Sequence, residues 1–316
     1  MHSSNRLSFH HALKAVIVLG FAMLIVYLVK TDNLMLYIAP RMADYVTWSA
    51  VALYAVGMYE LFASLRAWWG RSSDCECGHD HTPSRSIFRN TAVYGLFALP
   101  LLLGFLLPNT TLGSSMAEKK GMNLSGASSI RREAPQAAAG TNGTTGTGME
   151  AVAPTSYTAA NNAEEDRLNQ LFPADKFTQP YADFAKKLYQ LPVIEVKEEW
   201  YVETLNTVDL YKDSFVGRRM ELVGFVYRQD EMSDNQFVVG RFAMQCCSAD
   251  AAPFGMLMEY DRARQWADDT WVRVSGIIQK TTYLGEEIMV LKVDKVSKLD
   301  TPKENQYVYA NPEFGL

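Results

Sequence analysis

The sequence predicts a membrane protein with two folded parts: three transmembrane α-helices, and then an all-β C-terminal domain that forms a five-stranded OB-like barrel with one short helix. Three observations predict this class. Residues 1–107 contain three long apolar runs, residues 108–166 are rich in small and polar residues, and the part after Gly217 alternates β-type runs with turn signals. The expected parts are a transmembrane anchor at 1–107, a largely disordered linker at 108–166 and an extracytoplasmic OB-like domain at 167–316.

Each apolar run can cross a bilayer, which needs about 17 to 25 helical residues, and the first run, at about 17 residues, lies near the lower limit. The expected spans are 13–30, 45–65 and 89–107. A cleaved signal peptide is the alternative for the first run, but no small-residue cleavage site follows closely and two further runs come after it. Glu60 interrupts the second run; it either reaches the nearby interface or makes a polar contact inside the helix bundle.

Basic residues in the short loops predict the orientation in the membrane. The N-terminus and the segment between the second and third runs together contain six arginines and lysines, against two between the first and second runs. Loops rich in these residues stay in the cytoplasm. We therefore expect a multi-pass protein of the plasma membrane, with the N-terminus in the cytoplasm and the C-terminal domain outside.

Charge and histidine content exclude several functions for the C-terminal part. Residues 108–316 carry 22 basic and 29 acidic residues, whereas an electrostatic nucleic-acid binder needs a basic surface. All five histidines lie within the first 81 residues, so neither a histidine base nor a histidine-ligated zinc can act there. The sequence also lacks the GxxxxGK[ST] motif of P-loop ATPases. We expect neither enzyme activity nor a nucleic-acid partner.

The C-terminal domain begins with a helical pattern and continues as strands. Apolar spacing predicts a helix over 181–191, and the segment 199–213 is ambiguous. Turn signals separate five β-type runs, at residues 218–228, 236–245, 255–260, 271–280 and 287–299. A short charged segment at 261–269, compatible with a helix, lies between the third and fourth runs. This is the order of an OB fold, with a small β-sandwich as the alternative.

A cluster of potential metal ligands occupies the loop between the second and third apolar runs. Cys75, Cys77, His79 and His81 stand at alternate positions. Two thiolates and two imidazoles suit tetrahedral Zn²⁺ or Cu(I). The alternative is a solvated polar loop, because the spacing is not that of a standard zinc finger.

A second cluster follows the second β-type run, in the sequence RFAMQCCSADA. Cys246, Cys247 and Asp250 offer two thiolates and one carboxylate to a soft or borderline cation. Arg241 precedes them on the strand. Two other interpretations stay open. The neighbouring cysteines could form a strained, labile disulfide, or could pack as small apolar residues at the rim of a barrel.

Several segments resemble one bacterial family. LYIAPRM after the first run, TLGSSMAEKKGMN after the third, and GRFAMQCCSADAAPFGMLMEYD in the last domain are similar to the YcgQ-like two-component permease subunits. These are membrane proteins with a C-terminal domain of unknown function. The resemblance implies a larger polytopic permease of the YcgR-like type as the partner, and homeostasis of zinc or another metal. The cysteine- and histidine-containing loop varies in that family, so it is expected to be an accessory feature.

The sequence therefore predicts a non-enzymatic accessory subunit of a plasma-membrane permease, with metal ions as a candidate substrate and zinc as a candidate cofactor. The outer domain would bind substrate or gate the partner through Cys246, Cys247, Asp250 and Arg241. The alternative is an extracytoplasmic redox-active domain that uses the two adjacent thiols.

Overall fold

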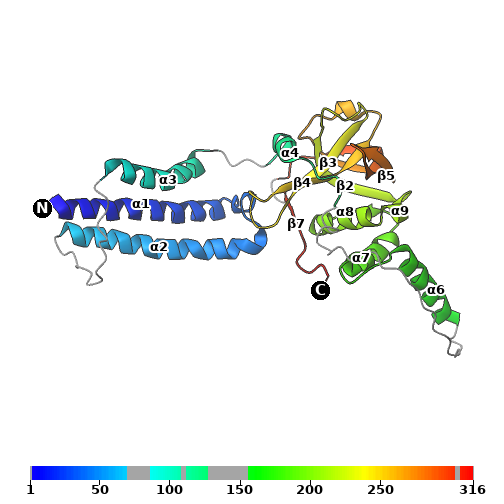
Figure 1. Ribbon diagram of the computed structural model, residues 1–316, viewed down its shortest axis with the longest axis horizontal. Helices are drawn as coiled ribbons and strands as arrows, with labels where there is room; N and C mark the ends of the chain where they lie inside the picture. Colours follow the sequence, from blue (N-terminus) through cyan, green and yellow to red (C-terminus); the bar gives the residue numbers. More distant parts are fainter. Residues whose placement is uncertain (1, 70–85, 108–111, 127–155, 303–306, 316) are drawn as a thin grey trace. The chain divides into compact units, whose positions relative to one another are not determined.

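The computed structural model describes residues 2–69, 86–107, 112–126, 156–302 and 307–315 of the chain (Figure 1). These residues belong to two compact units. One unit contains Met1–Thr111 together with Cys246–Ala249, and the other contains Leu112–Gln245 together with Asp250–Leu316.

Three long helices form most of the first unit, and α1 lies between the other two (Figure 1). Each is long and apolar enough to cross a membrane, which confirms three apolar helices at the positions of the expected spans. A short 3₁₀ turn, η1, follows α1 at Leu34–Leu36. The helices are α1 at His2–Lys30, α2 at Pro40–Trp68 and α3 at Ile87–Leu106.

Glycines allow the helices of this unit to approach closely. A Cβ atom at Gly57 of α2 would lie 2.6 Å from Cγ of Leu19, and one at Gly104 of α3 would lie 2.8 Å from a methyl carbon of Leu24. Leu19 and Leu24 of α1 thus pack directly against glycines of α2 and α3. Such contacts between small and large residues are a main source of helix association where there is no hydrophobic driving force.

Five strands of the second unit close into a barrel, as the sequence predicts. Neighbours in the barrel follow the order β2-β5-β6-β4-β3, and β3 pairs again with β2. Among these five strands the β4–β6 pair is parallel and the other pairs are antiparallel, which matches the order and directions of an OB fold. The strands are β2 at Arg219–Tyr227, β3 at Gln236–Met244, β4 at Ala252–Glu259, β5 at Trp271–Tyr283 and β6 at Glu286–Lys298.

Two short strands extend this barrel at its edges. The two-residue β1, Ile194–Glu195, pairs in parallel with β2. The three-residue β7, Tyr307–Tyr309, pairs in parallel with β3. Neither is predicted from the sequence, because segments this short carry no readable alternation of apolar and polar residues.

The helical regions differ in part from expectation. The predicted helix at 181–191 is α7, Gln179–Tyr189. The ambiguous segment 199–213 is helical, and the segment 261–269 contains only a 3₁₀ turn within the part that the structure describes. The remaining elements here are η2 at Glu198–Trp200, α8 at Tyr201–Leu210, α9 at Lys212–Phe215 and η3 at Ala263–Gln265.

Helix α8 covers the barrel with one apolar stripe. Tyr201, Leu205 and Val208 are spaced by four and three residues, and all three are buried in the core. This spacing places them on one face of a helix. Packing against the barrel therefore decides the conformation of a segment whose local pattern is ambiguous.

A segment before the barrel also packs on it. Helix α4, Ser114–Lys120, begins where Ser114 donates two hydrogen bonds to Asp269. Asn123 then exchanges backbone hydrogen bonds with β4, at Pro253 and Gly255. These residues lie within the interval expected as a linker, which also contains the start of α6, Ser156–Leu171. Residues 108–111 and 127–155 of that interval lie outside the described residues.

Candidate functional site

The candidate ligands lie in the loop that joins β3 to β4, residues 245–251, here named the thiol loop. The backbone N–H of Gln245 donates to Oδ1 of Asp250 at 2.8 Å, which bends the loop back on itself. Lys120 donates from Nζ to the carbonyl of Ala251 and so places an ammonium group at the base of the loop. The loop is a short hairpin connection whose ends are fixed by the two strands.

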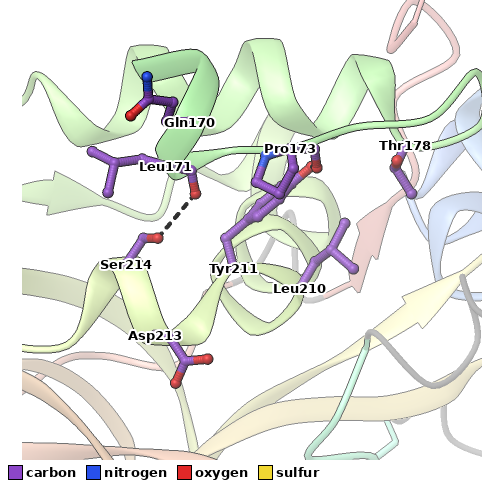
Figure 2. A pocket seen from close by; sticks show the side chains of 8 residues that line it. All are labelled: Gln170, Leu171, Pro173, Thr178, Leu210, Tyr211, Asp213 and Ser214. Atoms are coloured by element: carbon purple, nitrogen blue, oxygen red, sulfur yellow. Dashed lines mark hydrogen bonds between the residues drawn. The ribbon is translucent and has the colours of Figure 1, made fainter. Parts of the chain in front are cut away.

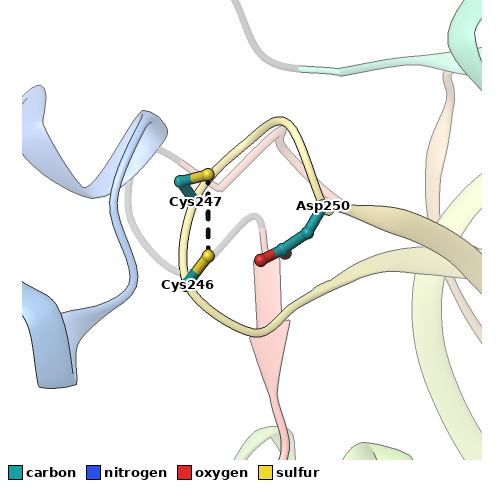
Figure 3. A group of neighbouring side chains, drawn as sticks. All are labelled: Cys246, Cys247 and Asp250. Carbon is teal, nitrogen blue, oxygen red and sulfur yellow. Dashed lines mark hydrogen bonds between the residues drawn. The ribbon is translucent and has the colours of Figure 1, made fainter.

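Three potential metal ligands meet in the thiol loop (Figure 3). The Sγ atoms of Cys246 and Cys247 and a carboxylate oxygen of Asp250 all lie within 4.8 Å of one another. The two Sγ atoms are 3.7 Å apart, far beyond the roughly 2.05 Å of a disulfide bond. Two thiolates on a tetrahedral zinc ion, at about 2.3 Å each, would be about 3.8 Å apart.

The three side chains are accessible to a ligand. Cys246 and Asp250 are exposed and Cys247 is half-buried, so the thiols are not packed as core residues. A cation held by these three groups would keep at least one coordination position open, as exchangeable or catalytic zinc sites do.

The thiol loop is also held by the segment between α1 and α2. Within the first unit, Ala39 donates its N–H to the carbonyl of Cys246 at 3.0 Å, and Ser248 donates to the carbonyl of Tyr37 at 2.8 Å. Ile38 and Cys247 form an antiparallel bridge. Residues 37–39 and 246–248 are thus paired although they lie far apart in the sequence, so no local sequence pattern could have predicted this pairing.

Arg241, the fourth residue expected at this site, does not join the group. Its side chain is only 1% exposed, and Nη1 donates to Oε1 of Glu198 at 2.9 Å. The guanidinium carbon lies 5.3 Å from the ring centre of Trp271 and 5.9 Å from that of Tyr201. Arg241 therefore belongs to a separate, buried centre.

The second expected cluster lies outside the described residues. Cys75, Cys77, His79 and His81 fall within residues 70–85. Metal binding by this loop stays a prediction from its donor set.

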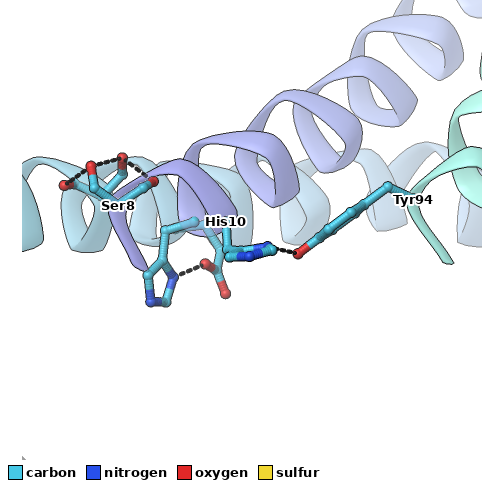
Figure 4. Close-up of polar contacts among 6 residues, drawn as sticks. Ser8, His10 and Tyr94 are labelled. Atoms are coloured by element: carbon cyan, nitrogen blue, oxygen red, sulfur yellow. Dashed lines mark hydrogen bonds and ion pairs between the residues drawn. The ribbon is translucent and has the colours of Figure 1, made fainter. Parts of the chain in front are cut away.

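Polar side chains join the three long helices near one end (Figure 4). His11 of α1 contacts Glu60 of α2, with 2.5 Å between Nδ1 and Oε2. Nδ1 of His10 lies 2.9 Å from the hydroxyl of Tyr94 on α3. Ser8 and Ser64 each donate a hydrogen bond to the other's backbone carbonyl. Of the two interpretations of Glu60, the structure supports a polar contact inside the bundle.

A cavity of about 450 Å³ opens beside α6, α8 and α9 (Figure 2). Two of its polar groups have partners within the protein: the Tyr211 hydroxyl donates to the carbonyl of Pro173, and Ser214 Oγ donates to the carbonyl of Leu171. It contains no group of nucleophiles or metal ligands among the residues that line it, which are Gln170, Leu171, Pro173, Thr178, Leu210, Tyr211, Asp213 and Ser214. The cavity is therefore a weaker candidate site than the thiol loop.

Two models of one protein family match the chain. The DUF1980 N-terminal domain matches residues 13–123, and the DUF1980 C-terminal domain matches residues 171–310. The first match contains α1 from Leu13 onward, all of α2 and α3, and ends at Asn123, beyond α4. The second contains the barrel, the thiol loop and Arg241.

Curated relatives are similar over most of their length. The UPF0703 protein YcgQ of Bacillus subtilis is 26% identical over 312 residues, which cover 94% of this chain and 98% of the relative. A Streptococcus mutans protein named "Putative two-component membrane permease complex subunit" is 27% identical over 216 residues, which cover 68% of this chain and 72% of the relative.

Proposed function

This chain belongs to the DUF1980 family, and we propose on that premise that it is a non-enzymatic accessory subunit of a plasma-membrane permease. The name of the Streptococcus mutans relative and the three candidate spans support this proposal. The proposed partner is a larger polytopic permease of the YcgR-like type. Co-purification of the full chain with a polytopic membrane protein tests this claim, and recovery of the chain alone under mild detergent would contradict it.

The proposed substrate class is a soft or borderline metal ion, with zinc as the best match. One observation carries this proposal: two thiol sulfurs and a carboxylate lie within 4.8 Å of one another on an accessible loop. Thiolate ligands select zinc and Cu(I) over magnesium and calcium. An incomplete ligand set suits a site that must release its ion to a partner, because an exchange ligand can enter the open position.

Metal titration of the full chain in detergent tests the site. We expect one equivalent of Zn²⁺ to bind to the thiol loop and to be lost in the double variant Cys246→Ser/Cys247→Ser. The matched control is Cys75→Ser/Cys77→Ser, which removes the other pair of thiols and keeps the thiol loop intact. Equal zinc binding by both variants and the unaltered protein would exclude the thiol loop as the metal site.

The proposal also requires the thiol loop to face the outside of the cell. In the Cys75→Ser/Cys77→Ser background, the thiols of Cys246 and Cys247 are the only ones left. A membrane-impermeant maleimide should then label intact cells, and Cys246→Ser/Cys247→Ser should remove the label. Labelling only after permeabilisation would mean that the thiol loop faces the cytoplasm, and the thiol loop could then not bind substrate outside the cell.

The alternative function is redox exchange by the same two thiols. The two Sγ atoms lie 3.7 Å apart, and a disulfide between neighbouring residues would be strained and therefore labile, as a redox-active bond is. Oxidation by a small disulfide would pass two electrons and two protons to that reagent and leave a Cys246–Cys247 disulfide. Quantitative, reversible oxidation that abolishes zinc binding would support this function, and thiols inert to the reagent would exclude it.

A further inference from the structure

A short ladder of backbone contacts attaches the thiol loop to the segment between α1 and α2. Residues 37–39 pair with residues 246–248, and this pairing is here named the loop ladder. Its two hydrogen bonds, of 3.0 and 2.8 Å, lie on either side of the antiparallel bridge between Ile38 and Cys247. Accordingly, Cys246–Ala249 belong to the same compact unit as the three long helices. The backbone that carries both thiols is therefore held by residues outside the barrel.

The other side of the loop ladder is the residue that caps α2. Ala39 is the N-cap of this helix, and its carbonyl accepts a hydrogen bond of the first turn, from the N–H of Met42 at 2.8 Å. Its own N–H donates to the carbonyl of Cys246 at 3.0 Å. Ala39 is only 1% exposed, so water does not compete readily for either bond. One residue thus joins the backbone of a candidate ligand to the first turn of a candidate span.

The spacing of the two thiols depends on the backbone of the loop. Their Sγ atoms are 3.7 Å apart, close to the roughly 3.8 Å between two thiolates on tetrahedral zinc. Adjacent residues of a regular strand direct their side chains to opposite faces, so the loop must leave that conformation to bring both sulfurs together. Contacts that hold metal ligands in place commonly change metal affinity by about 10- to 100-fold.

We propose that the loop ladder positions the two thiols for metal binding and couples a bound metal to the start of α2. This inference rests on the proposed metal function and deepens it, because it states how the membrane helices respond to the metal. Tyr37 and Ala39 are positioning residues that act through their backbone groups. Coupling free energies are reciprocal, so a ladder that tightens metal binding is itself stabilised by the metal, by the same factor.

The topology of the chain permits this coupling in either orientation. Two candidate spans, α2 and α3, separate the α1–α2 segment from the thiol loop in the sequence. Two crossings return the chain to the side from which it started, so the two partners of the loop ladder lie on one side of the membrane. A metal taken up on that side acts on the nearer end of α2.

Zinc titration of the full chain in detergent, in the Cys75→Ser/Cys77→Ser background, tests the positioning role. Ala39→Pro removes the N–H donor at a residue whose φ of −63° already suits proline. We expect it to weaken Zn²⁺ binding about tenfold. Ala39→Gly keeps the N–H and should bind Zn²⁺ within about twofold of the background protein. Equal affinity in all three proteins, or an equal loss in both variants, would overturn the proposal.

Amide hydrogen exchange tests the coupling without any substitution in the loop ladder. Saturating Zn²⁺ should slow exchange of the Ala39 and Ser248 N–H groups about tenfold, the factor by which Ala39→Pro loses affinity. The control is the N–H of Leu107, which donates to the carbonyl of Leu103 at the end of α3 and should not respond. Unchanged exchange at Ala39 and Ser248 would overturn the proposal, even if Ala39→Pro failed to fold.

The double variant Cys246→Ser/Cys247→Ser distinguishes this inference from the proposed metal function. It should lose both zinc binding and the zinc-dependent protection of Ala39, and protection that persists in it would overturn the coupling. Zinc binding at the thiol loop with no response at Ala39 would overturn the coupling alone and leave the metal function intact. Absence of zinc binding at the thiol loop of the unaltered protein would overturn both.

Discussion

Arg241 and the thiol loop are neighbours in sequence, yet they are opposite kinds of site. Cys246, Cys247 and Asp250 are accessible and lie on a loop that is bent by the hydrogen bond from the Gln245 N–H to the Asp250 carboxylate. Arg241 is buried, and its side chain is placed by Glu198 and two aromatic rings. Strand alternation separates them: β3 directs Arg241 inward, and the loop begins only after Met244. Arg241 and the thiol loop are therefore separate, although only four residues lie between Arg241 and Cys246, because Arg241 belongs to the regular strand and the cysteines follow its end.

The largest difference between the two regions should appear in stability. Arg241→Ala removes a large, fully buried side chain and should destabilise the C-terminal domain by about 3 kcal/mol, because it leaves a cavity and unpairs Glu198. Cys247→Ala, in the half-buried loop, should cost about 0.5 kcal/mol or less. Chemical denaturation followed by circular dichroism measures both. A loss of stability in Arg241→Ala as small as that expected for Cys247→Ala would mean that Arg241 has no structural role in the domain.

Metal affinity should depend on the thiol loop and not on Arg241, which is the opposite of the difference expected in stability. Asp250→Asn replaces a charged ligand by a neutral one and should weaken zinc binding by about tenfold, whereas Arg241→Lys should leave it unchanged. Asparagine keeps an oxygen that can accept the N–H of Gln245, so the shape of the loop is preserved. Competition with a chromophoric chelator measures the affinity. A loss of zinc binding in Arg241→Lys would indicate that Arg241 and the thiol loop belong to one metal site.

A buried carboxyl group on α8, that of Glu203, differs from both regions: it accepts a hydrogen bond but has no cationic partner among the described residues. Glu203 is 4% exposed and accepts the N–H of Asn311 at 2.7 Å. Burial raises the pKa of Glu203 above its ordinary value, and the hydrogen bond from Asn311 opposes this. The folded state therefore binds the proton more tightly than the unfolded chain does.

The stability of the domain should consequently fall as the pH rises through the folded-state pKa of Glu203. The contribution of this group is complete below its unfolded pKa, near 4.5, and its loss has a slope of at most about 1.4 kcal/mol per pH unit. Glu203→Gln keeps an oxygen for Asn311 and should remove this component of the profile. An identical pH profile for the variant would show that Glu203 does not titrate in this range.

The five barrel strands and the three spans could be predicted because each carries a long local pattern. The thiol group could also be predicted, since its three candidate ligands lie within five residues of sequence. The pairing of Cys246 with Ala39 and the contact of Arg241 with Glu198 could not, because each joins segments far apart in the chain. The helix α8 was ambiguous for the same reason: its conformation depends on the barrel that it covers.

A small effect is also expected at the polar contacts of the long helices. His11 and Glu60 lie 2.5 Å apart, but hydrogen bonds between helices in membranes contribute only about 0.6 kcal/mol on average. Glu60→Gln should therefore destabilise the bundle by less than about 1 kcal/mol, in contrast to the loss of Arg241. Unfolding of the full chain in bicelles measures this, with Ser64→Ala as a control at a neighbouring polar contact. A cost above about 2 kcal/mol for Glu60→Gln alone would contradict this estimate. It would indicate that the His11–Glu60 pair is a principal determinant of helix association, because removing one partner of a truly buried ion pair leaves the other uncompensated.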